Sequence, residues 1–225
     1  ALCAAAAATT SLVPGVAQAA TTTPIEHVVV IYSENISFDH YFGTYPNALN
    51  KDGEKLQGSD KDAPKFTAKK DTPKAKNLEN DGVMGNKNPN SVKPFRIGPD
   101  HAVTTDQNHH YGDEQAAYNG GKMDKFPETV STDIDKSSNG YYAVPGMTMG
   151  YYDGNTVTGM WNYAQNFAMN DNSYSTIFGP STPGALNLIS GTVAGGTMHD
   201  PATGEQKKIE PGKNHALAGV SEDGK

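Results

Sequence analysis

The segment from Ile25 to Gly43 constrains the fold most, because it joins an apolar run to a dense polar cluster. Val28 to Ile31 is a β-branched run that is too short to span a membrane and is typical of a strand buried on both faces. Glu34 and Asn35 follow where this strand should end. In open α/β sheets ligand sites form at the carboxyl ends of strands, so the sequence predicts a ligand site at this point.

A carboxylate and an amide oxygen are hard ligands that suit a divalent cation, so Glu34 and Asn35 are the predicted metal ligands. A structural interpretation is also open, because Asn35 or Ser37 could cap a helix that begins directly afterwards. Asp39 would then lie in the first turn of that helix. For Asp39 and His40 we favour the structural role, and for Glu34 and Asn35 the metal. The identity of the metal stays open.

Composition excludes one class of partner. The chain has 225 residues, with 18 Lys and Arg against 25 Asp and Glu, and a net charge of −7. Nonspecific binding of nucleic acid needs a basic surface, so we expect no nucleic-acid partner. The 24 glycines and 14 prolines predict that loops form a large share of a single domain.

Residues 1–19 have the composition of an export signal. They are rich in alanine and close with Ala17-Gln18-Ala19, which matches a signal-peptide cleavage site before Ala20. We expect the remainder of a signal peptide and a mature protein that is periplasmic or secreted; an Ala-rich leader without this role is the alternative. The sole cysteine, Cys3, lies in this leader, so the mature part would contain no disulfide and no Cys-ligated zinc.

The middle of the chain is a polar stretch. Residues 50–103 are rich in Lys, Asp, Asn and Pro and have almost no periodic apolar pattern. We interpret them as an insert that passes over the active-site side or as a partly disordered surface segment. Their lysines alternate with acids, which favours a solvated surface over a docking patch.

The second polar cluster begins at Asp106-Gln107-Asn108 and contains a pair of histidines. His109 and His110 could donate to a phosphoryl oxygen, act as a general acid or bind metal, although adjacent histidines are often ordinary surface residues. A short helix is predicted over 115–118, with Asn119-Gly120-Gly121 as its C-terminal cap. The two glycines would let backbone approach a substrate closely, or simply form a turn.

The third cluster places a hydroxyl on a rigid turn. Ser181 lies between Gly-Pro and Pro-Gly at the entry of a predicted helix that includes 185–189, and a further helix is predicted over 160–169. A helix N-terminus favours an attacking alkoxide and a bound phosphate. The alternative is that Ser181 or Thr182 is a plain N-cap with Pro183 at the first helical position.

Three segments together carry a resemblance to a known family. They are EHVVVIYSENISFDHYFGTYP, the block around NHHYGDEQAAYNGGKMDKF, and NYAQNFAMNDNSYSTIFGPSTPGALNLISGT. The chain resembles the bacterial phosphoesterases that include phosphatidylcholine-type phospholipases C and respiratory-burst-inhibiting acid phosphatases, within the alkaline phosphatase superfamily. The resemblance implies a three-layer α/β/α sandwich around a mainly parallel sheet, with residues 20–225 as the N-terminal part of the catalytic domain.

The resemblance also implies roles for individual residues. Glu34 and Asn35 match the metal-binding pair, and Ser181 matches the hydroxyl nucleophile. His109 matches a catalytic histidine on the phosphate side, with His110 and Asn119 as substrate-binding neighbours. The chain departs from many phospholipases C in having Gln115 where they have a histidine. Family members are longer and carry further ligands downstream, so we expect an incomplete sheet and no activity from this fragment alone.

The implied activity is metal-dependent hydrolysis of a phosphate ester through a serine nucleophile. The substrate would be a phosphate monoester or a phospholipid head group, the latter with transient contact at a membrane surface. The alternative is a secreted binding protein that keeps the fold without turnover. The oligomeric state stays open.

Overall fold

The computed structural model describes residues 22–25, 27, 29, 36–131, 141–175, 181–191, 197–199 and 202–208. The chain divides into two compact units, 1–34 and 35–225. The described residues of the first unit form no helix or strand. The leader 1–19 and the metal pair Glu34 and Asn35 lie outside the described residues, as does the predicted strand except for Val29, which is exposed.

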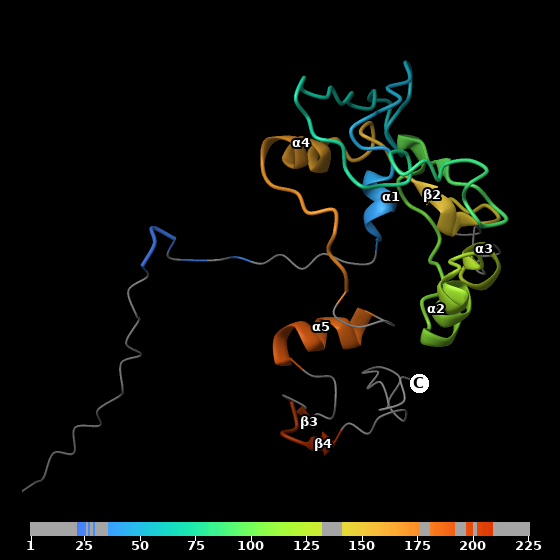
Figure 1. Cartoon of the computed structure of the whole chain (residues 1–225). Coiled ribbons are helices and arrows are strands. Elements are labelled where there is room, and N and C mark those ends of the chain that lie inside the picture. Colours follow the sequence, from blue (N-terminus) through green and yellow to red (C-terminus); the bar gives the residue numbers. More distant parts are fainter. Residues whose placement is uncertain are drawn as a thin grey trace, which may run out of the picture. The chain divides into compact units, whose positions relative to one another are not determined.

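The second unit contains short helices and very short strands (Figure 1). The α-helices are α1 (Phe38–Phe42), α2 (Tyr111–Tyr118), α3 (Phe126–Thr129), α4 (Thr158–Asn166) and α5 (Ser181–Ser190). The 3-10 turns are η1 (Pro99–His101), η2 (Asn119–Gly121) and η4 (Met147–Met149). The strands are β1 (Phe95–Arg96), β2 (Gly150–Tyr151), β3 (Thr197–His199) and β4 (Gln206–Lys208). None of the helices described is long and apolar enough to cross a membrane.

Parallel pairing joins distant parts of the chain. Strand β1 pairs with β2 in parallel, with Phe95 opposite Gly150 and Arg96 opposite Tyr151. A parallel bridge between Thr104 and Tyr142 adds a second link of the same kind. Helices combined with a small parallel sheet agree with the predicted α/β class. Strands β3 and β4 form a separate antiparallel pair.

The helices predicted from the sequence are present. Helix α2 includes 115–118 and ends at Asn119, which has φ +47° and caps the helix in the left-handed conformation. Gly120 continues the turn with φ +64°, a conformation that glycine adopts without strain. Helix α4 covers most of 160–169. Helix α5 includes 185–189 but begins four residues earlier, at Ser181.

One hydrophobic core forms around Trp161 of α4. Tyr45 and Phe66 meet its indole edge-on, with ring centroids 5.3 Å and 5.1 Å away and interplanar angles of 85°. Such edge-to-face pairs add to the gain from burial. The indole Nε1 donates to the carbonyl oxygen of Tyr41 at 2.7 Å, so the buried N–H is satisfied and α4 is tied to α1. A Cβ on Gly154 would lie 2.7 Å from the indole, so the tight packing requires glycine there.

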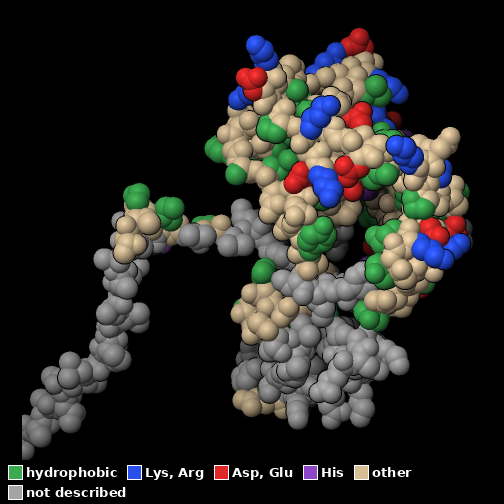
Figure 2. All heavy atoms as spheres, in the orientation of Figure 1, with side chains coloured by type: hydrophobic (Ala, Val, Ile, Leu, Met, Phe, Trp, Pro, Cys, Tyr) green, Lys and Arg blue, Asp and Glu red, His purple; other side chains and the backbone are tan. Residues whose placement is uncertain are grey.

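The polar stretch 50–103 contributes to this interior, although regular elements are few. Phe66 and Ala75 belong to the Trp161 core, and Ile97 belongs to a second core with Met147 and Tyr152. On the surface, Lys and Arg side chains are interspersed with Asp and Glu on the face that Figure 2 shows.

Buried asparagines of this stretch form hydrogen bonds with the backbone of other segments. Asn77 Nδ2 donates to the carbonyl oxygens of Phe42 and Tyr45, at 2.7 Å and 2.9 Å. Asn90 donates through Nδ2 to the carbonyl oxygen of Met123 at 2.9 Å, and its Oδ1 accepts the Phe126 N–H at the start of α3. These side chains supply hydrogen-bond partners to backbone groups that are not paired in a β-sheet.

A buried ion cluster joins four segments. Both guanidinium NH groups of Arg96 donate to the Glu54 carboxylate, at 2.5 Å and 2.8 Å, and Arg96 Nε donates to Asp153 at 2.9 Å. Asp153 also accepts the Leu49 N–H at 2.8 Å. The side chains of Arg96, Glu54 and Asp153 are 12%, 17% and 2% exposed. The two carboxylates raise the pKa of Arg96, so its charge is fixed.

We predict that Arg96→Met destabilises the protein by about 3–5 kcal/mol, because two carboxylates lose their cation in a poorly solvated position. Urea unfolding followed by circular dichroism measures the loss. Lys55→Ala is the control, because it removes an ion pair to Asp62 that is largely exposed. That pair is worth less than about 1 kcal/mol. Equal losses in the two variants would contradict a structural role for the Arg96 cluster.

Candidate functional site

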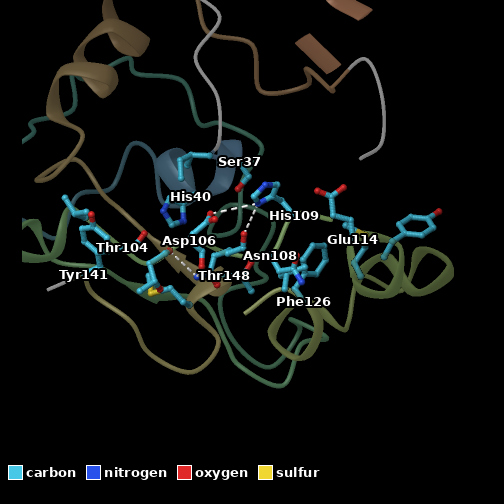
Figure 3. Close-up of a pocket in the computed structure, with 18 residues that line it drawn as sticks. Ser37, His40, Thr104, Asp106, Asn108, His109, Glu114, Phe126, Tyr141 and Thr148 are labelled. Carbon is cyan, nitrogen blue, oxygen red and sulfur yellow. Dashed lines mark hydrogen bonds and ion pairs between the residues drawn. The ribbon is translucent and has the colours of Figure 1, made fainter. Parts of the chain in front are cut away.

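A pocket of about 680 Å³ lies among the start of α1, the stretch 103–109, and side chains from α2, α3 and η4 (Figure 3). The stretch 103–109 forms its largest continuous wall. Figure 3 shows His40, Asp106, Asn108, His109 and Glu114 gathered around it. The pocket therefore collects chemically active groups from the first two polar clusters of the sequence.

Backbone contacts hold the wall at 103–109 in place. Thr105 N donates to the Tyr142 carbonyl at 3.0 Å, and Asn108 N donates to the Val130 carbonyl at 2.8 Å. Ser131 Oγ donates to Gln107 Oε1 at 3.0 Å and accepts the Thr148 N–H at 2.8 Å. Asn108 Nδ2 also donates to Asp113 in the first turn of α2, at 2.5 Å. An irregular segment is thus fixed through Thr105, Gln107 and Asn108, directly before the histidine at its end.

His109 lies at the exposed edge of this wall. Its Nδ1 is 3.0 Å from the Gln107 carbonyl oxygen and 4.0 Å from Asp106 Oδ1. Its side chain is 59% exposed, so a ligand can reach the ring from solvent. His110 stacks beside it with a centroid distance of 5.9 Å and precedes α2, but it does not line the pocket.

His40 lines the pocket from α1 and is more deeply placed. Its ring meets Tyr152 edge-on at 5.0 Å, and its carbonyl oxygen accepts the Tyr152 N–H at 2.7 Å. Burial lowers the pKa of His40, and a backbone contact with Gly150 opposes part of that effect. The buried Nε2 atom has no hydrogen-bond partner in the described part of the chain. The His40 ring is therefore neutral, and its Nε2 atom makes no hydrogen bond within the described residues.

Carboxylates, and no Lys or Arg, are found among the described lining residues. Burial raises the pKa of Glu114, and the nearby His109 partly offsets this rise. Tyr118, Phe126 and Tyr141 supply aromatic surface to the same pocket. Asp106 lies at the same exposed edge as His109, 73% exposed and 4.0 Å from its Nδ1, whereas the lining apart from Asp106, Glu114 and the histidines is neutral or apolar.

The predicted metal ligands Glu34 and Asn35 lie outside the residues that the structure describes. Within the described ranges, no three His, Cys, Asp or Glu side chains gather in a way that could hold a metal ion. Glu34 and Asn35 fall outside those ranges, immediately before the described residues Ile36 and Ser37 of the pocket lining. The metal site stays a prediction.

Two further predicted residues have clear local positions. Asn119 Nδ2 donates to Asp124 Oδ1 at 2.7 Å, and Asn119 does not line the pocket. Ser181 is the first residue of α5, a helix of ten residues, with Pro183 two positions later inside it. The alternative in which Pro183 occupies the first helical position thus differs from the observed helix start.

Sequence reasoning assigned His40 a structural role and did not single out Thr105. His40 has that structural role through Tyr152, yet it also lines the pocket. Thr105 is 4% exposed, and its hydroxyl has no hydrogen-bond partner within the described residues. The sequence indicated a site only through the polar residues that follow Thr105. It could not show that the Thr105 hydroxyl is unpaired, because that depends on contacts made in the folded protein.

A hydrogen bond made by Asp39, next to His40, confirms the structural role that we favoured for this residue. Its Oδ1 accepts the Leu78 N–H at 3.2 Å, which ties α1 to the polar stretch. Ser37 precedes α1 at the N-cap position but makes no side-chain capping hydrogen bond, so its hydroxyl is not used for the helix start.

The lowered pKa of His40 predicts a pH effect on stability. The unfolded chain, with the ordinary value of 6.5, takes up this proton at higher pH than the folded protein does. Stability from a neutral His40 is therefore present above about pH 6.5 and is lost as pH falls below it. We expect the urea midpoint to fall less between about pH 7 and about pH 5 in His40→Asn than in wild type.

The raised pKa values of Asp39 and Glu114 act in the opposite direction, but they are shared by both proteins. The difference between wild type and variant therefore isolates His40. Parallel pH profiles for the two proteins would contradict burial of a neutral ring.

The comparisons with known proteins cover nearly the whole chain. Residues 25–220 match the model of the Phosphoesterase family. The chain is 29% identical to phospholipase C A of Mycobacterium tuberculosis over 198 residues, which covers 84% of this chain and 33% of that protein. It is 26% identical to non-hemolytic phospholipase C of Pseudomonas aeruginosa over 198 residues, or 81% of this chain and 24% of that protein. The chain thus spans a third or less of the length of these relatives, and it belongs to the Phosphoesterase family.

Proposed function

We propose that the protein to which this chain belongs hydrolyses phosphate esters. The observation that carries the proposal is a pocket with His109 at its accessible edge, within a segment that matches the Phosphoesterase family model. The two relatives are named as phospholipases C, which supports the same reaction class. His109 would donate a hydrogen bond to a phosphoryl oxygen or protonate the leaving oxygen.

Ser181 is the proposed nucleophile. Its Oγ would attack phosphorus, the P–O bond to the alcohol would break, and water would then release phosphate or a phosphorylated head group from the phosphoserine. The position of Ser181 at the start of α5 supports this role, because the dipole of a helix N-terminus favours negative charge. His110 and Asn119 are proposed to support substrate binding near the histidine pair.

Glu34 and Asn35 are proposed to bind a divalent metal together with ligands beyond this segment. The bound ion would supply Lewis-acid assistance to the attacking hydroxyl and to the developing charge on the phosphoryl oxygens. Carboxylate and amide oxygens suit such a cation, and both residues precede the pocket lining directly in sequence.

The larger architecture is proposed on the same grounds. Residues 20–225 would form the N-terminal part of a three-layer α/β/α sandwich, in which the β1–β2 pair is one parallel connection. Residues 1–19 would be an export signal, which places the protein in the periplasm or outside the cell. A phospholipid substrate would bring the protein into transient contact with a membrane surface.

We predict that Ser181→Ala in the full gene product lowers turnover of p-nitrophenyl phosphate or p-nitrophenylphosphorylcholine by at least about a thousandfold, because the covalent step is lost. Thr182→Val, which removes the neighbouring hydroxyl, is the matched control and should keep turnover. Monoester hydrolysis alone would identify a phosphatase, and hydrolysis of the choline diester would identify a phospholipase C. Unchanged turnover in a folded Ser181→Ala protein would remove Ser181 from this role, and no turnover in metal-loaded wild type would favour a binding protein.

We predict that Glu34→Gln reduces the bound divalent metal, because an amide replaces the only carboxylate of the predicted pair. Elemental analysis after dialysis measures the metal-to-protein ratio, and a loss of about tenfold in affinity is expected. Glu114→Gln is the control, since this carboxyl lines the pocket but is not a predicted ligand. Equal metal content in wild type and Glu34→Gln would remove Glu34 from the ligand set.

A further inference from the structure

The side chain of Gln107 is folded back onto its own segment of the pocket wall. Its Nε2 donates to the carbonyl oxygens of Thr105 and Asp106, at 3.2 Å and 2.9 Å. Its Oε1 accepts the hydroxyl hydrogen of Ser131 at 3.0 Å. Ser131 is 5% exposed, and its oxygen accepts the Thr148 N–H at 2.8 Å, which leaves its own hydrogen free to donate. Both ends of the Gln107 amide are therefore committed to contacts that fix the bend of its own backbone.

This bend presents the carbonyl oxygen of Gln107 to His109. The Nδ1 atom of His109 is 3.0 Å from that oxygen, and a carbonyl oxygen can only accept, so Nδ1 carries the hydrogen. In a neutral ring the other nitrogen, Nε2, then holds the lone pair. Nε2 makes no hydrogen bond within the described residues, and the side chain is 59% exposed. Nε2 is therefore the nitrogen that a ligand can use.

The charges around His109 favour a ring that becomes positive. Asp106 Oδ1 lies 4.0 Å from Nδ1 (Figure 3), and Glu114 is close enough to interact electrostatically with the ring. The described lining contains no Lys or Arg that would oppose these carboxylates. Carboxylates stabilise an imidazolium and repel a phosphoryl oxygen. The oxygen of an alcohol or of water is therefore a better partner for Nε2 than a phosphoryl oxygen is.

We propose that Gln107 is a positioning residue, which holds a hydrogen of His109 on Nδ1 so that the ring transfers protons through Nε2. Gln107 acts within the proposed phosphoesterase function, on which this inference rests. The imidazolium gives its Nε2 proton to the leaving alcohol oxygen as the P–O bond breaks, and water returns a proton to Nε2 as its oxygen attacks the phosphoserine. Ser181 loses its own proton to solvent in the first step and regains one from solvent in the second.

The tautomer of His109 can be measured without any activity. In the full gene product with isotopically labelled histidine, nitrogen chemical shifts distinguish an N–H from a bare ring nitrogen at about pH 8.5, above the range in which histidine usually titrates. The signals of His109 are identified by their loss in His109→Asn. We expect the hydrogen on Nδ1 in wild type and a mixture of tautomers in Gln107→Leu. A hydrogen on Nε2 of His109 in wild type would overturn the proposal.

A comparison of leaving groups separates proton transfer from a general structural effect. The p-nitrophenolate group departs without a proton, whereas phenolate departs more readily with one. The full gene product gives kcat/KM for the phenyl and p-nitrophenyl esters of the class that wild type hydrolyses, phosphate monoesters or phosphorylcholine diesters. We expect Gln107→Leu to lower kcat/KM about tenfold more for the phenyl ester, a part of what general acid catalysis contributes. Ser131→Ala should change the ratio in the same direction, and Ser131→Thr, which keeps the hydroxyl, should restore it.

Gln165→Leu is the matched control. The Gln165 amide is committed in the same way, because it accepts the Lys69 N–H at 3.0 Å and donates to Asn162 at 2.9 Å. It lies on α4 and does not line the pocket. This variant should leave both the tautomer of His109 and the ratio of the two esters unchanged.

The outcomes separate the positioning role from the proposed function. Equal losses on the two esters in Gln107→Leu would overturn proton transfer through Nε2 and reduce Gln107 to a structural residue. If wild type hydrolyses neither monoesters nor diesters, the proposed function fails, and the measured tautomer still decides whether Gln107 positions the ring. If Gln107→Leu does not fold, the pair Ser131→Ala and Ser131→Thr tests the same contact, and identical ester ratios in wild type and Ser131→Ala would then overturn the proposal.

Discussion

The buried pairing of Arg96 with Glu54 and Asp153 is the constraint on which the rest of the described structure depends. It joins β1, the end of β2 and the polar stretch at one point, and Asp153 adds the backbone of Leu49. A group of charges with so little exposure is stable only when its geometry is complete. The polar stretch is therefore anchored, and the pocket wall that follows it at 103–109 starts from a fixed position.

The two hydrophobic cores position different elements around the pocket. The Trp161 core fixes α1 and α4 against the polar stretch through aromatic contacts and one indole hydrogen bond. The second core contains Ile97, Met147 and Tyr152. Met147 belongs to this core and also lines the pocket. Because Tyr152 also contacts His40, the packing that stabilises the second core sets the orientation of a pocket histidine.

Local features of the fold could be predicted from the sequence, whereas long-range ones could not. The end of α2 could be predicted because Asn and Gly readily adopt the left-handed conformation that ends a helix, and α4 could be predicted from its helical spacing. The α/β class was expected from the family resemblance, and the observed parallel pairing involves β1 and β2. The contribution of 50–103 to the interior was not visible, because single residues such as Phe66 and Ile97 create no periodicity.

In the candidate site, too, local features could be predicted from the sequence and long-range contacts could not. His109 was identifiable from its polar neighbours, but the unpaired atoms of His40 and Thr105 exist only through contacts between distant segments. The roles of Glu34, Asn35 and Ser181 stay predictions that rest on the family resemblance.

The asparagine side chains that satisfy the backbone have a consequence for how this region can change during evolution. Surface loops usually accept insertions and deletions, because little depends on the spacing of their residues. Here Asn77 and Asn90 must reach particular carbonyl and amide groups of remote segments. A change of loop length would shift those amides out of reach, so this irregular stretch has the length constraint of a strand in a sheet.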